Sequence, residues 1–339
     1  MRVFVYEYVT GGGFLSSPDE PIATSLLAEG HAMLAALATD FAALPGVDVT
    51  TLVDHRLSAL PWPRVARQIV ESAEHEWRLF AHLAASADWT VVIAPEFAGH
   101  LRRRCEVVEG LGRRLLGPGS ELVTLASDKT ALLAYLADAG VRVAQGICWT
   151  GGEPWPDRLT YPVVLKPNDG AGSLGVQVLL GPPDAQSVPN AGAWRIETLH
   201  RGRHASVAVL TGPGPAVICR PCEQRLSTDG RFTYLGGRLL LEPVVEQRAR
   251  RLAEQVVASL PAAVGYLGLD LVLGDKPDGS DDRVIELNPR LTTSYIGLRA
   301  ACRDNLASAM LTAAAGRPSV LLWRDEKLEF DASGEVRAV

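Results

Sequence analysis

The residues with the clearest capacity for chemistry lie in one stretch near the end of the chain, Val284-Ile-Glu-Leu-Asn-Pro-Arg290. The stretch begins with the apolar, β-branched character of a buried strand, so Glu286 and Asn288, two positions apart, point to the same face. A carboxylate beside an amide oxygen suits a hard cation such as Mg²⁺. The guanidinium of Arg290, which is always charged and fork-shaped, can hold a phosphate or carboxylate next to that cation.

A further acidic residue, Asp270, lies in the preceding apolar run, residues 265–273. The turn-rich residues 274–282 would join the two runs as an antiparallel hairpin. Alone, an E-x-N pattern favours a plain polar turn after a buried strand over a metal site. The hairpin would bring Asp270 beside Glu286 and Asn288, where the three side chains could share one or two metal ions.

A lysine and a glycine-rich turn occur together in residues 161–178, which are expected to form strand, turn and strand. Lys166 lies in an otherwise apolar strand, where an unpaired ammonium is costly, so it needs an anionic partner. The turn is not a Walker A loop, because the lysine precedes the glycines and no helix follows. A plain β-hairpin is the alternative to phosphate binding by backbone N–H groups. The turn contains Gly170, Gly172, Ser173 and Gly175.

A second lysine, Lys129, lies at the start of a helix expected over residues 130–139, with Ser127 or Asp128 as the capping residue. A helix N-terminus attracts phosphate, and Lys129 would add its own charge there. Taken alone, Lys129 would be an ordinary surface lysine.

The first part of the chain alternates strands, expected at residues 1–9, 47–53 and 89–94, with helices, expected at residues 23–44, 69–85 and 98–116. This alternation is typical of a parallel, doubly wound sheet, whose ligands bind at the carboxyl ends of the strands. Such ends hold the candidate substrate contacts Gly11, Gly12, Gly13 and Glu96. The glycine turn does not match the dinucleotide pattern G-x-G-x-x-G, and helix capping or a surface salt bridge is the alternative for Glu96.

The rest of the chain has a different organisation. Leu116-Gly-Pro-Gly119 is a suitable domain boundary, after which strands and a helix over residues 244–260 indicate an antiparallel sheet. A last helix, residues 297–315, would end at Gly316. The expected fold combines α/β and α+β parts: a doubly wound N-terminal domain (1–118), a central subdomain (119–195), a C-terminal subdomain (196–323) and a polar tail (324–339).

The composition restricts the class of protein. The 339 residues suffice for two or three domains, and 47% hydrophobic with 21% charged residues is typical of globular proteins. A net charge of −6 without a basic stripe argues against a nucleic-acid partner, and no apolar run approaches the ~20 residues that span a membrane. The strand-like N-terminus and five scattered cysteines favour a reducing cytoplasm. Cys219-Arg-Pro-Cys222 has no partner pair, so a zinc site is not favoured.

The strand lysine before a glycine-rich loop, the helix-start lysine and the D…E-x-N-P-R hairpin together resemble the ATP-grasp superfamily, from about Leu116 to Gly316. The resemblance implies an ATP-grasp fold that binds ATP with Mg²⁺ or Mn²⁺. Lys129 and Lys166 would hold the α- and β-phosphates, and residues 169–175 would close over the nucleotide. The implied loop contacts are Asp169, Gly170, Gly172, Ser173 and Gly175.

The same resemblance implies roles for residues outside the loop. Arg290 would steady the transferred phosphoryl group. The implied metal ligands are Asp270, Glu286 and Asn288. The implied adenine contacts are Glu197 and the backbone of Thr198 and Leu199. His204 departs from the pattern, because many members place an acidic residue on the ribose hydroxyls at this position.

A narrower resemblance lies in Tyr6-Glu-Tyr-Val-Thr-Gly-Gly-Gly13 together with Asn288-Pro-Arg-Leu-Thr-Thr-Ser-Tyr-Ile-Gly-Leu-Arg299. These segments resemble the tyramine–L-glutamate ligases of methanofuran biosynthesis and their bacterial relatives linked to one-carbon metabolism. The resemblance implies condensation of the glutamate γ-carboxylate with an aromatic amine, tyramine or tyrosine. The implied contacts are Thr292, Thr293, Ser294 and Arg299 for the glutamate or its acyl phosphate, and Gly11, Gly12, Gly13 and Glu96 for the amine.

The expected reaction is phosphoryl transfer from ATP to a carboxylate, followed by attack of a neutral amine. This chemistry depends on cationic stabilisation of phosphate charge more than on a protein nucleophile. The partners would be small molecules, and a homodimer stays open. Two alternatives remain: an ATP-grasp ligase for another amino-acid or peptide pair, and a nucleotide-binding module without catalysis.

Overall fold

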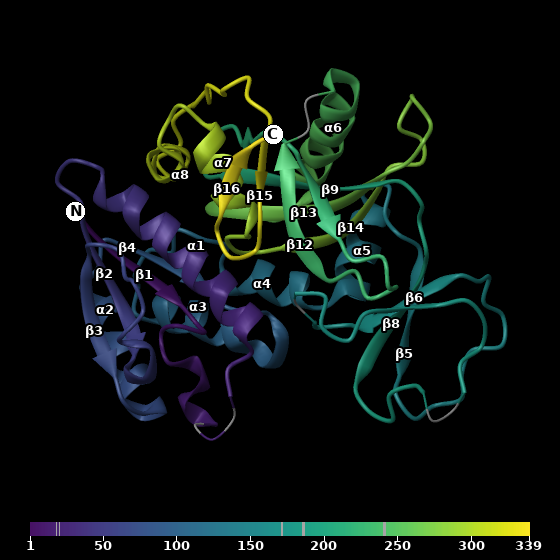
Figure 1. Cartoon of the computed structure of the whole chain (residues 1–339), viewed down its shortest axis with the longest axis horizontal. Helices are drawn as coiled ribbons and strands as arrows, with labels where there is room; N and C mark the ends of the chain where they lie inside the picture. The colour runs from purple at the N-terminus through teal and green to yellow at the C-terminus, as the bar shows by residue number, and fades with distance from the viewer. Residues whose placement is uncertain (18, 20, 171, 185–186, 240–241) are drawn as a thin grey trace.

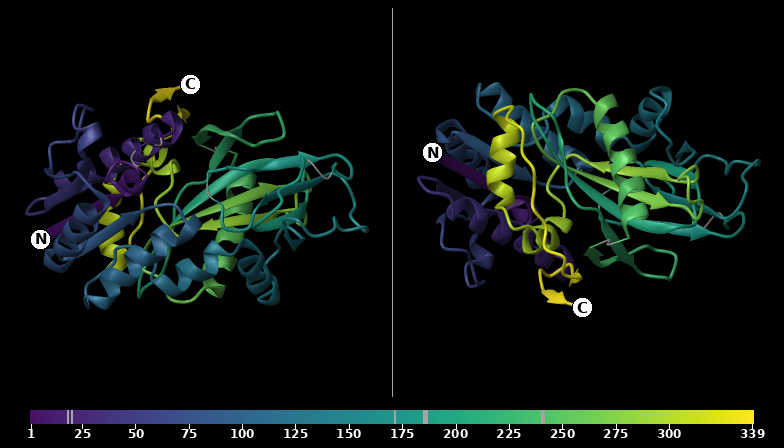
Figure 2. Two further views of the ribbon diagram at one scale, coloured as in Figure 1. Left: turned by 90° about the horizontal axis from the view of Figure 1, so that it is seen from below. Right: turned by 90° about the horizontal axis from the view of Figure 1, so that it is seen from above.

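The computed structural model of the chain describes residues 1–17, 19, 21–170, 172–184, 187–239 and 242–339. Within these residues, three sheets divide the chain into an N-terminal, a central and a C-terminal region (Figure 1). Figure 2 shows the N-terminal and central regions at opposite ends of the molecule, with the C-terminal region between them.

The N-terminal region is a parallel sheet with helices packed on both faces. Its strands, in spatial order, are β3 (Ala66–Val70), β2 (Asp48–Asp54), β1 (Arg2–Glu7) and β4 (Trp89–Ile93). Its helices are α1 (Thr24–Ala42), α2 (Ala73–Ser86) and α3 (His100–Gly110), with 3₁₀ turns at Gly13–Ser16, His55–Leu57 and Phe97–Gly99. Val3 and Val5 of β1 pack in one cluster with α1, whereas Phe4 and Tyr6 pack with α2 on the opposite face. The expected doubly wound α/β sheet is confirmed.

The central region is an antiparallel sheet preceded by α4 (Ser120–Ser127) and α5 (Lys129–Asp138). Its strands, in spatial order, are β5 (Gly146–Thr150), β8 (Ala193–Thr198), β6 (Val163–Pro167) and β7 (Gln177–Leu179). The expected boundary between residues 195 and 196 falls inside β8, which pairs with β6 from Trp194 to Thr198. The central region therefore extends to Thr198.

The C-terminal region is a second antiparallel sheet with helices on both faces. Its strands are β9 (Arg203–Thr211), β10 (Val217–Ile218), β11 (Cys222–Leu226), β12 (Tyr234–Leu239), β13 (Gly265–Leu273), β14 (Arg283–Asn288), β15 (Leu328–Phe330) and β16 (Val336–Ala338). Their spatial order is β14-β13-β9-β11-β12-β15-β16, and β10 pairs with β9. Leu267 and Leu269 of β13 pack with α6 (Pro243–Ser259), whereas Tyr266 packs on the other side with α7 (Ser294–Ala301) and α8 (Leu306–Ala314).

The expected helix over residues 69–85 was wrong at its start, because the sheet has a further strand, β3, there. The four side chains from Ala66 to Ile69 are exposed on this edge strand. A strand with so little burial carries no apolar alternation, so the sequence pattern did not reveal it.

Two expectations near the C-terminus were also wrong. The single helix over residues 297–315 is two helices, because Cys302 is extended and Asn305 caps α8 by accepting a hydrogen bond from Ser308 N–H. The residues from 324 onward are not a separate tail. They include β15, which pairs with β12 and buries Phe330 against Gly297.

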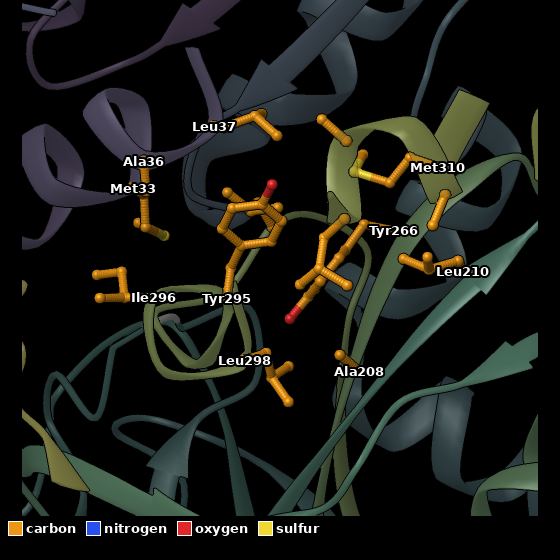
Figure 3. Packing of buried hydrophobic residues seen from close by; sticks show 14 of the residues in the cluster. Met33, Ala36, Leu37, Ala208, Leu210, Tyr266, Tyr295, Ile296, Leu298 and Met310 are labelled. Carbon is orange, nitrogen blue, oxygen red and sulfur yellow. The ribbon is translucent and has the colours of Figure 1, made fainter. Parts of the chain in front are cut away.

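The N-terminal and C-terminal regions share one hydrophobic core. Figure 3 shows Met33 and Leu37 of α1 beside Tyr295 and Ile296 of α7, and the same cluster extends to Met310 of α8. A core shared in this way fixes the orientation of the two regions. Among the described residues, no helix combines the length and the apolar character needed to cross a bilayer.

A buried polar network lies within this shared core. Asp40 of α1 accepts hydrogen bonds from the Tyr295 hydroxyl (2.7 Å) and from Arg299 Nε (2.9 Å), and Asn305 Nδ2 donates to its carbonyl oxygen (2.8 Å). The side chain of Asp40 is 12% exposed and that of Arg299 is 33% exposed.

We expect Asp40→Ala to destabilise the protein by roughly 2 kcal/mol, less than a fully buried pair would cost because Arg299 is partly solvated. The substitution leaves the Tyr295 hydroxyl and the Arg299 guanidinium without their shared acceptor. Urea unfolding followed by tryptophan fluorescence measures the effect, with Asp138→Ala, at an exposed position of α5, as the control. Equal unfolding midpoints for the two variants would contradict this role.

Candidate active site

One cleft contains most of the residues that the sequence analysis selected. It lies between the central and C-terminal sheets and has about 1290 Å³ of empty space, part of it open to solvent. The predicted residues that line it are Lys129, Lys166, Gly170, Gly172, Ser173, Glu197, Thr198, Leu199, His204, Asp270, Glu286, Asn288, Arg290, Thr292, Thr293 and Ser294.

The β13–β14 hairpin places the candidate metal ligands side by side. Asp270 pairs across the ladder with Glu286, and a bulge follows directly after Asp270. Asp270 accepts hydrogen bonds from Asn288 Nδ2 (3.0 Å) and Gln224 Nε2 (2.8 Å). Burial and the nearby charge of Glu286 raise the pKa of Asp270 to about 6. The site therefore holds two crowded carboxylates, a situation that a bound cation would relieve.

The donor set fits a hard divalent cation. Asp270, Glu286 and Asn288 offer oxygen atoms only, as Mg²⁺ and Mn²⁺ prefer. Among the described residues no group of three His, Cys, Asp or Glu side chains is arranged for a metal, and here the third donor is an amide. A cation bound at this hairpin would supply positive charge close to the phosphate groups of a nucleotide.

Lys129 links the hairpin to the glycine-rich loop. Its Nζ lies 3.0 Å from Glu286 Oε1 and also donates to the Gly170 carbonyl oxygen. Asp128, one of the two expected capping residues, is the cap of α5, since it accepts from Ala131 N–H at 2.8 Å. Lys129 is buried, so the alternative of an ordinary surface lysine is excluded.

Asn168 fixes the start of the glycine-rich loop, and the sequence analysis missed it. Its Oδ1 accepts from the Thr130 hydroxyl (2.8 Å), and its Nδ2 donates to Asp128 (2.8 Å). Because Asn168 is buried and contacts the first turn of α5, the loop begins at a defined place over that helix N-terminus. A signal was present, since a polar amide directly after a buried strand must find partners.

The described part of the loop adopts left-handed backbone at Gly172, Ser173 and Gly175, with φ values of 65°, 60° and 73°. Asp169 and Gly175 do not line the cleft, although both were expected to contact the nucleotide. Residue 171, within the predicted loop, lies outside the described residues.

Lys166 belongs to a buried charge chain that runs across β6 and β8. Its Nζ lies 2.7 Å from Glu197 Oε1, and the other Glu197 oxygen accepts from Arg195 Nε at 2.9 Å. Arg195 also donates to the Ala144 carbonyl oxygen at 2.8 Å. The sequence analysis missed Arg195. The signal was its position two residues before Glu197, which places both side chains on one face of a strand.

His204 and Phe232 form an aromatic wall of the cleft, with ring centroids 5.4 Å apart. Burial lowers the pKa of His204, so the imidazole is neutral near pH 7. A neutral imidazole has one donor and one acceptor nitrogen, whereas a carboxylate at this position would only accept.

Arg290 follows the β13–β14 hairpin, which we call the metal hairpin after its candidate ligands, and pairs with Glu96 of the N-terminal region. Its Nη2 donates to Asn288 Oδ1 at 3.3 Å, and its Nε lies 3.0 Å from Glu96 Oε1 as an ion pair. Burial disfavours the charged guanidinium, but the charges of Glu96 and Glu286 outweigh it, so the pKa of Arg290 is raised. The pair is not aligned as a hydrogen bond, and within the described residues both Glu96 carboxylate oxygens lack a hydrogen-bond donor. Glu96 is therefore buried beside the site instead of forming a surface salt bridge.

Besides Glu96, two sets of predicted substrate contacts do not line the cleft. Gly11, Gly12 and Gly13 are buried, and a Cβ at Gly11 would lie 2.5 Å from the Glu7 carbonyl oxygen, so packing accounts for the glycine there. Arg299 points to Asp40 in the shared core, where its guanidinium is paired. These glycines and Arg299 therefore serve the packing of the fold.

Comparisons with known proteins identify the family of the chain and its fold. Residues 126–294 match the ATP-grasp domain, and residues 47–123 match the pre ATP-grasp 3 domain. A protein from Archaeoglobus fulgidus assigned to the ATP-grasp superfamily is 22% identical, with 98% of this chain and 92% of that chain covered and a TM-score of 0.71.

Two further solved structures have the same fold. Carboxyaminoimidazole ribonucleotide synthase from Aspergillus clavatus, complexed with ATP, is 15% identical, covers 97% of this chain and 80% of its own, and has a TM-score of 0.67. L-amino acid ligase from Bacillus licheniformis is 16% identical, covers 100% of this chain and 77% of its own, and has a TM-score of 0.65. At these identities the likeness establishes the fold.

We expect Mg²⁺ affinity to decrease as the pH falls below about 6, because Asp270 then takes up a proton that competes with the cation. Isothermal titration of wild-type protein with Mg²⁺ across about pH 5–8 measures this dependence. In Asp270→Asn, binding should be weaker throughout and lose the step near pH 6. Wild-type affinity that is constant over this range would contradict a role for Asp270 as a ligand.

We expect Lys166→Ala to lower nucleotide-dependent turnover by roughly 10²–10³-fold, since a cation aimed at developing phosphate charge is lost. The fold should survive, because Arg195 still neutralises Glu197. Steady-state kinetics with ATP and circular dichroism measure the two effects. Lys276→Ala, at an exposed lysine of the β13–β14 turn, is the matched control and should keep wild-type turnover. Near-normal turnover in Lys166→Ala would argue against phosphate contact.

Proposed function

The chain belongs to the ATP-grasp superfamily of ATP-dependent carboxylate–amine ligases, and on this premise we propose that it joins the γ-carboxylate of glutamate to an aromatic amine, tyramine or tyrosine. The carboxylate takes the γ-phosphoryl group of ATP, and ADP leaves. The amine then attacks the acyl phosphate, an amide forms and phosphate leaves. The proposal includes Mg²⁺ or Mn²⁺ as the metal and a cytoplasmic location.

The observation that carries the proposal is the convergence of cations and oxygen ligands in one cleft. Lys129 and Lys166 approach from the central region, and Arg290 lies behind the metal hairpin of the C-terminal region. Phosphoryl transfer needs such positioned charge and no protein nucleophile. We assign Lys129 and Lys166 to the nucleotide phosphates, and Arg290 to the transferred phosphoryl group.

The adenine is assigned to the rim of the cleft formed by the end of β8. Glu197 is held there by Lys166 and Arg195, while the backbone of Thr198 and Leu199 continues along the cleft edge. Leu199 N–H already donates to the Pro162 carbonyl oxygen at 3.3 Å, so we assign the Leu199 carbonyl oxygen to the base. The ATP complex of the Aspergillus clavatus enzyme supports a nucleotide in a cleft of this fold.

The substrate pair rests on the narrower sequence resemblance and on Thr292, Thr293 and Ser294, which line the cleft beside Arg290. The Thr292 and Ser294 hydroxyls lie 2.8 Å apart, and both contact the Tyr266 hydroxyl. A row of fixed hydroxyls next to a guanidinium is suited to a carboxylate or an acyl phosphate.

A ligase for another amino-acid or peptide pair is the second candidate, favoured by the fold shared with L-amino acid ligase from Bacillus licheniformis. A binding module without catalysis is disfavoured, because both lysines, the oxygen ligands and Arg290 are present together in the cleft.

Purified protein with Mg²⁺-ATP, L-glutamate and either tyramine or tyrosine should release ADP and form a γ-glutamyl amide detectable by mass spectrometry. Omission of the amine and of glutamate in turn is the control. ADP release only with other acids or amines would favour the second candidate. Formation of AMP, or no turnover with any pair, would contradict the acyl-phosphate reaction.

A further inference from the structure

One residue of the N-terminal region reaches the cleft, and the sequence analysis did not select it. Glu29 of α1 is the one N-terminal residue among the described residues that line the cleft, where all the others come from residue 129 onward. The helix is held in place by the core it shares with α7 and by Asp40. The position of Glu29 is therefore set by the packing between regions.

The surroundings of Glu29 leave its carboxylate available. Arg290 lies near enough to act on its charge, but that guanidinium is already paired with Glu96. The other polar neighbours of the Glu29 carboxylate in the cleft are the Thr293 hydroxyl and the Tyr234 hydroxyl. Within the described part of the chain, no ion pair joins Glu29 to a cationic side chain.

Glu29 lies where the second step of the proposed reaction, attack of the amine on the acyl phosphate, would take place. Arg290 and the hydroxyls of Thr292–Ser294 mark where we assign the acyl phosphate, and Glu29 lines the cleft beside them. A partly buried carboxylate that accepts from the Thr293 hydroxyl but has no ion-pair partner among the described residues is suited to an ammonium group. An aliphatic amine is mostly protonated near pH 7, and it must lose that proton before it can attack.

We propose that Glu29 binds the ammonium form of the amine substrate and accepts its proton, so that the free amine attacks the acyl phosphate. The proposal rests on the proposed ligase function. The ammonium passes one proton to the Glu29 carboxylate and becomes a neutral amine. The nitrogen lone pair forms the C–N bond, the C–O bond to phosphate breaks with its electron pair, and the second amine proton leaves with the phosphate.

The electrostatic setting supports proton transfer. Burial raises the pKa of Glu29, and the charge of Arg290 and the Thr293 hydroxyl oppose that rise only in part. A base with a pKa closer to neutrality is more effective than an ordinary surface glutamate. The titratable groups that face Glu29 are Arg290 after β14 and Tyr234 on β12, while Glu7 of β1 packs against the neighbouring Gly30.

The test compares two nucleophiles in wild-type protein and in Glu29→Gln. Hydroxylamine is uncharged at neutral pH and needs no base, so hydroxamate formation reports acyl-phosphate formation alone. We expect Glu29→Gln to keep wild-type hydroxamate formation but to lose about 100-fold in kcat/KM for the aromatic amine near neutral pH. The loss should shrink as the pH rises and the free amine becomes abundant. Glu254→Gln, at an exposed position of α6, is the matched control.

The outcomes separate the proposal from its premise. Equal losses with hydroxylamine and with the amine, or a rise only in the KM for glutamate, would overturn the base role and place Glu29 in acid binding. No change in the amine pH profile would also overturn it. Absence of hydroxamate with the wild-type protein and every acid would overturn the ligase reaction itself, and the role of Glu29 with it.

Discussion

The cost of burying cations constrains the whole cleft. Lys129, Lys166 and Arg290 are removed from water, and each lies against a carboxylate within about hydrogen-bonding distance. None of these pairs is local in sequence, since the partners come from different strands or from different regions. The antiparallel central sheet, the β13–β14 hairpin and the end of β4 must all be in place before the charges are balanced. The charges in the cleft are thus balanced only when all three regions have folded together.

The N-terminal sheet contributes to the cleft at a distance from the nucleotide. Its strand β4 leads to Glu96, and its helix α1 carries Glu29, while the core around Tyr295 holds both against the C-terminal sheet. The N-terminal region therefore contributes residues to the surroundings of the cleft. It supplies two carboxylates close to Arg290, namely Glu96 as its ion-pair partner and Glu29 in the cleft.

The sequence was sufficient to select the parts of the candidate site in which a charged or polar side chain interrupts an apolar strand. Lys166 was selected because a charge in a buried strand needs a partner, and the Asp270–Glu286 hairpin because two apolar runs with oxygen ligands flank a turn-rich segment. The sequence could not predict Glu29, because on a helix that packs with other elements an acidic residue looks the same whether it faces solvent or a cleft. The glycine turn at residues 11–13 was misinterpreted for a related reason, since close packing and ligand approach both require glycine. Elements with little burial, such as β3, lacked a periodic signal altogether.

The contact between Lys129 and Glu286 joins the central region directly to the metal hairpin. A divalent cation at Glu286 would remove the counter-ion of Lys129, and a phosphate at Lys129 would free Glu286 for the cation. Each ligand would thereby make the binding of the other more favourable, which is reciprocal coupling between two sites. Without either ligand the two side chains neutralise one another and bridge the cleft. If metal and nucleotide bind at these two side chains, the pair would make their binding cooperative and would disfavour a state that holds only one of them.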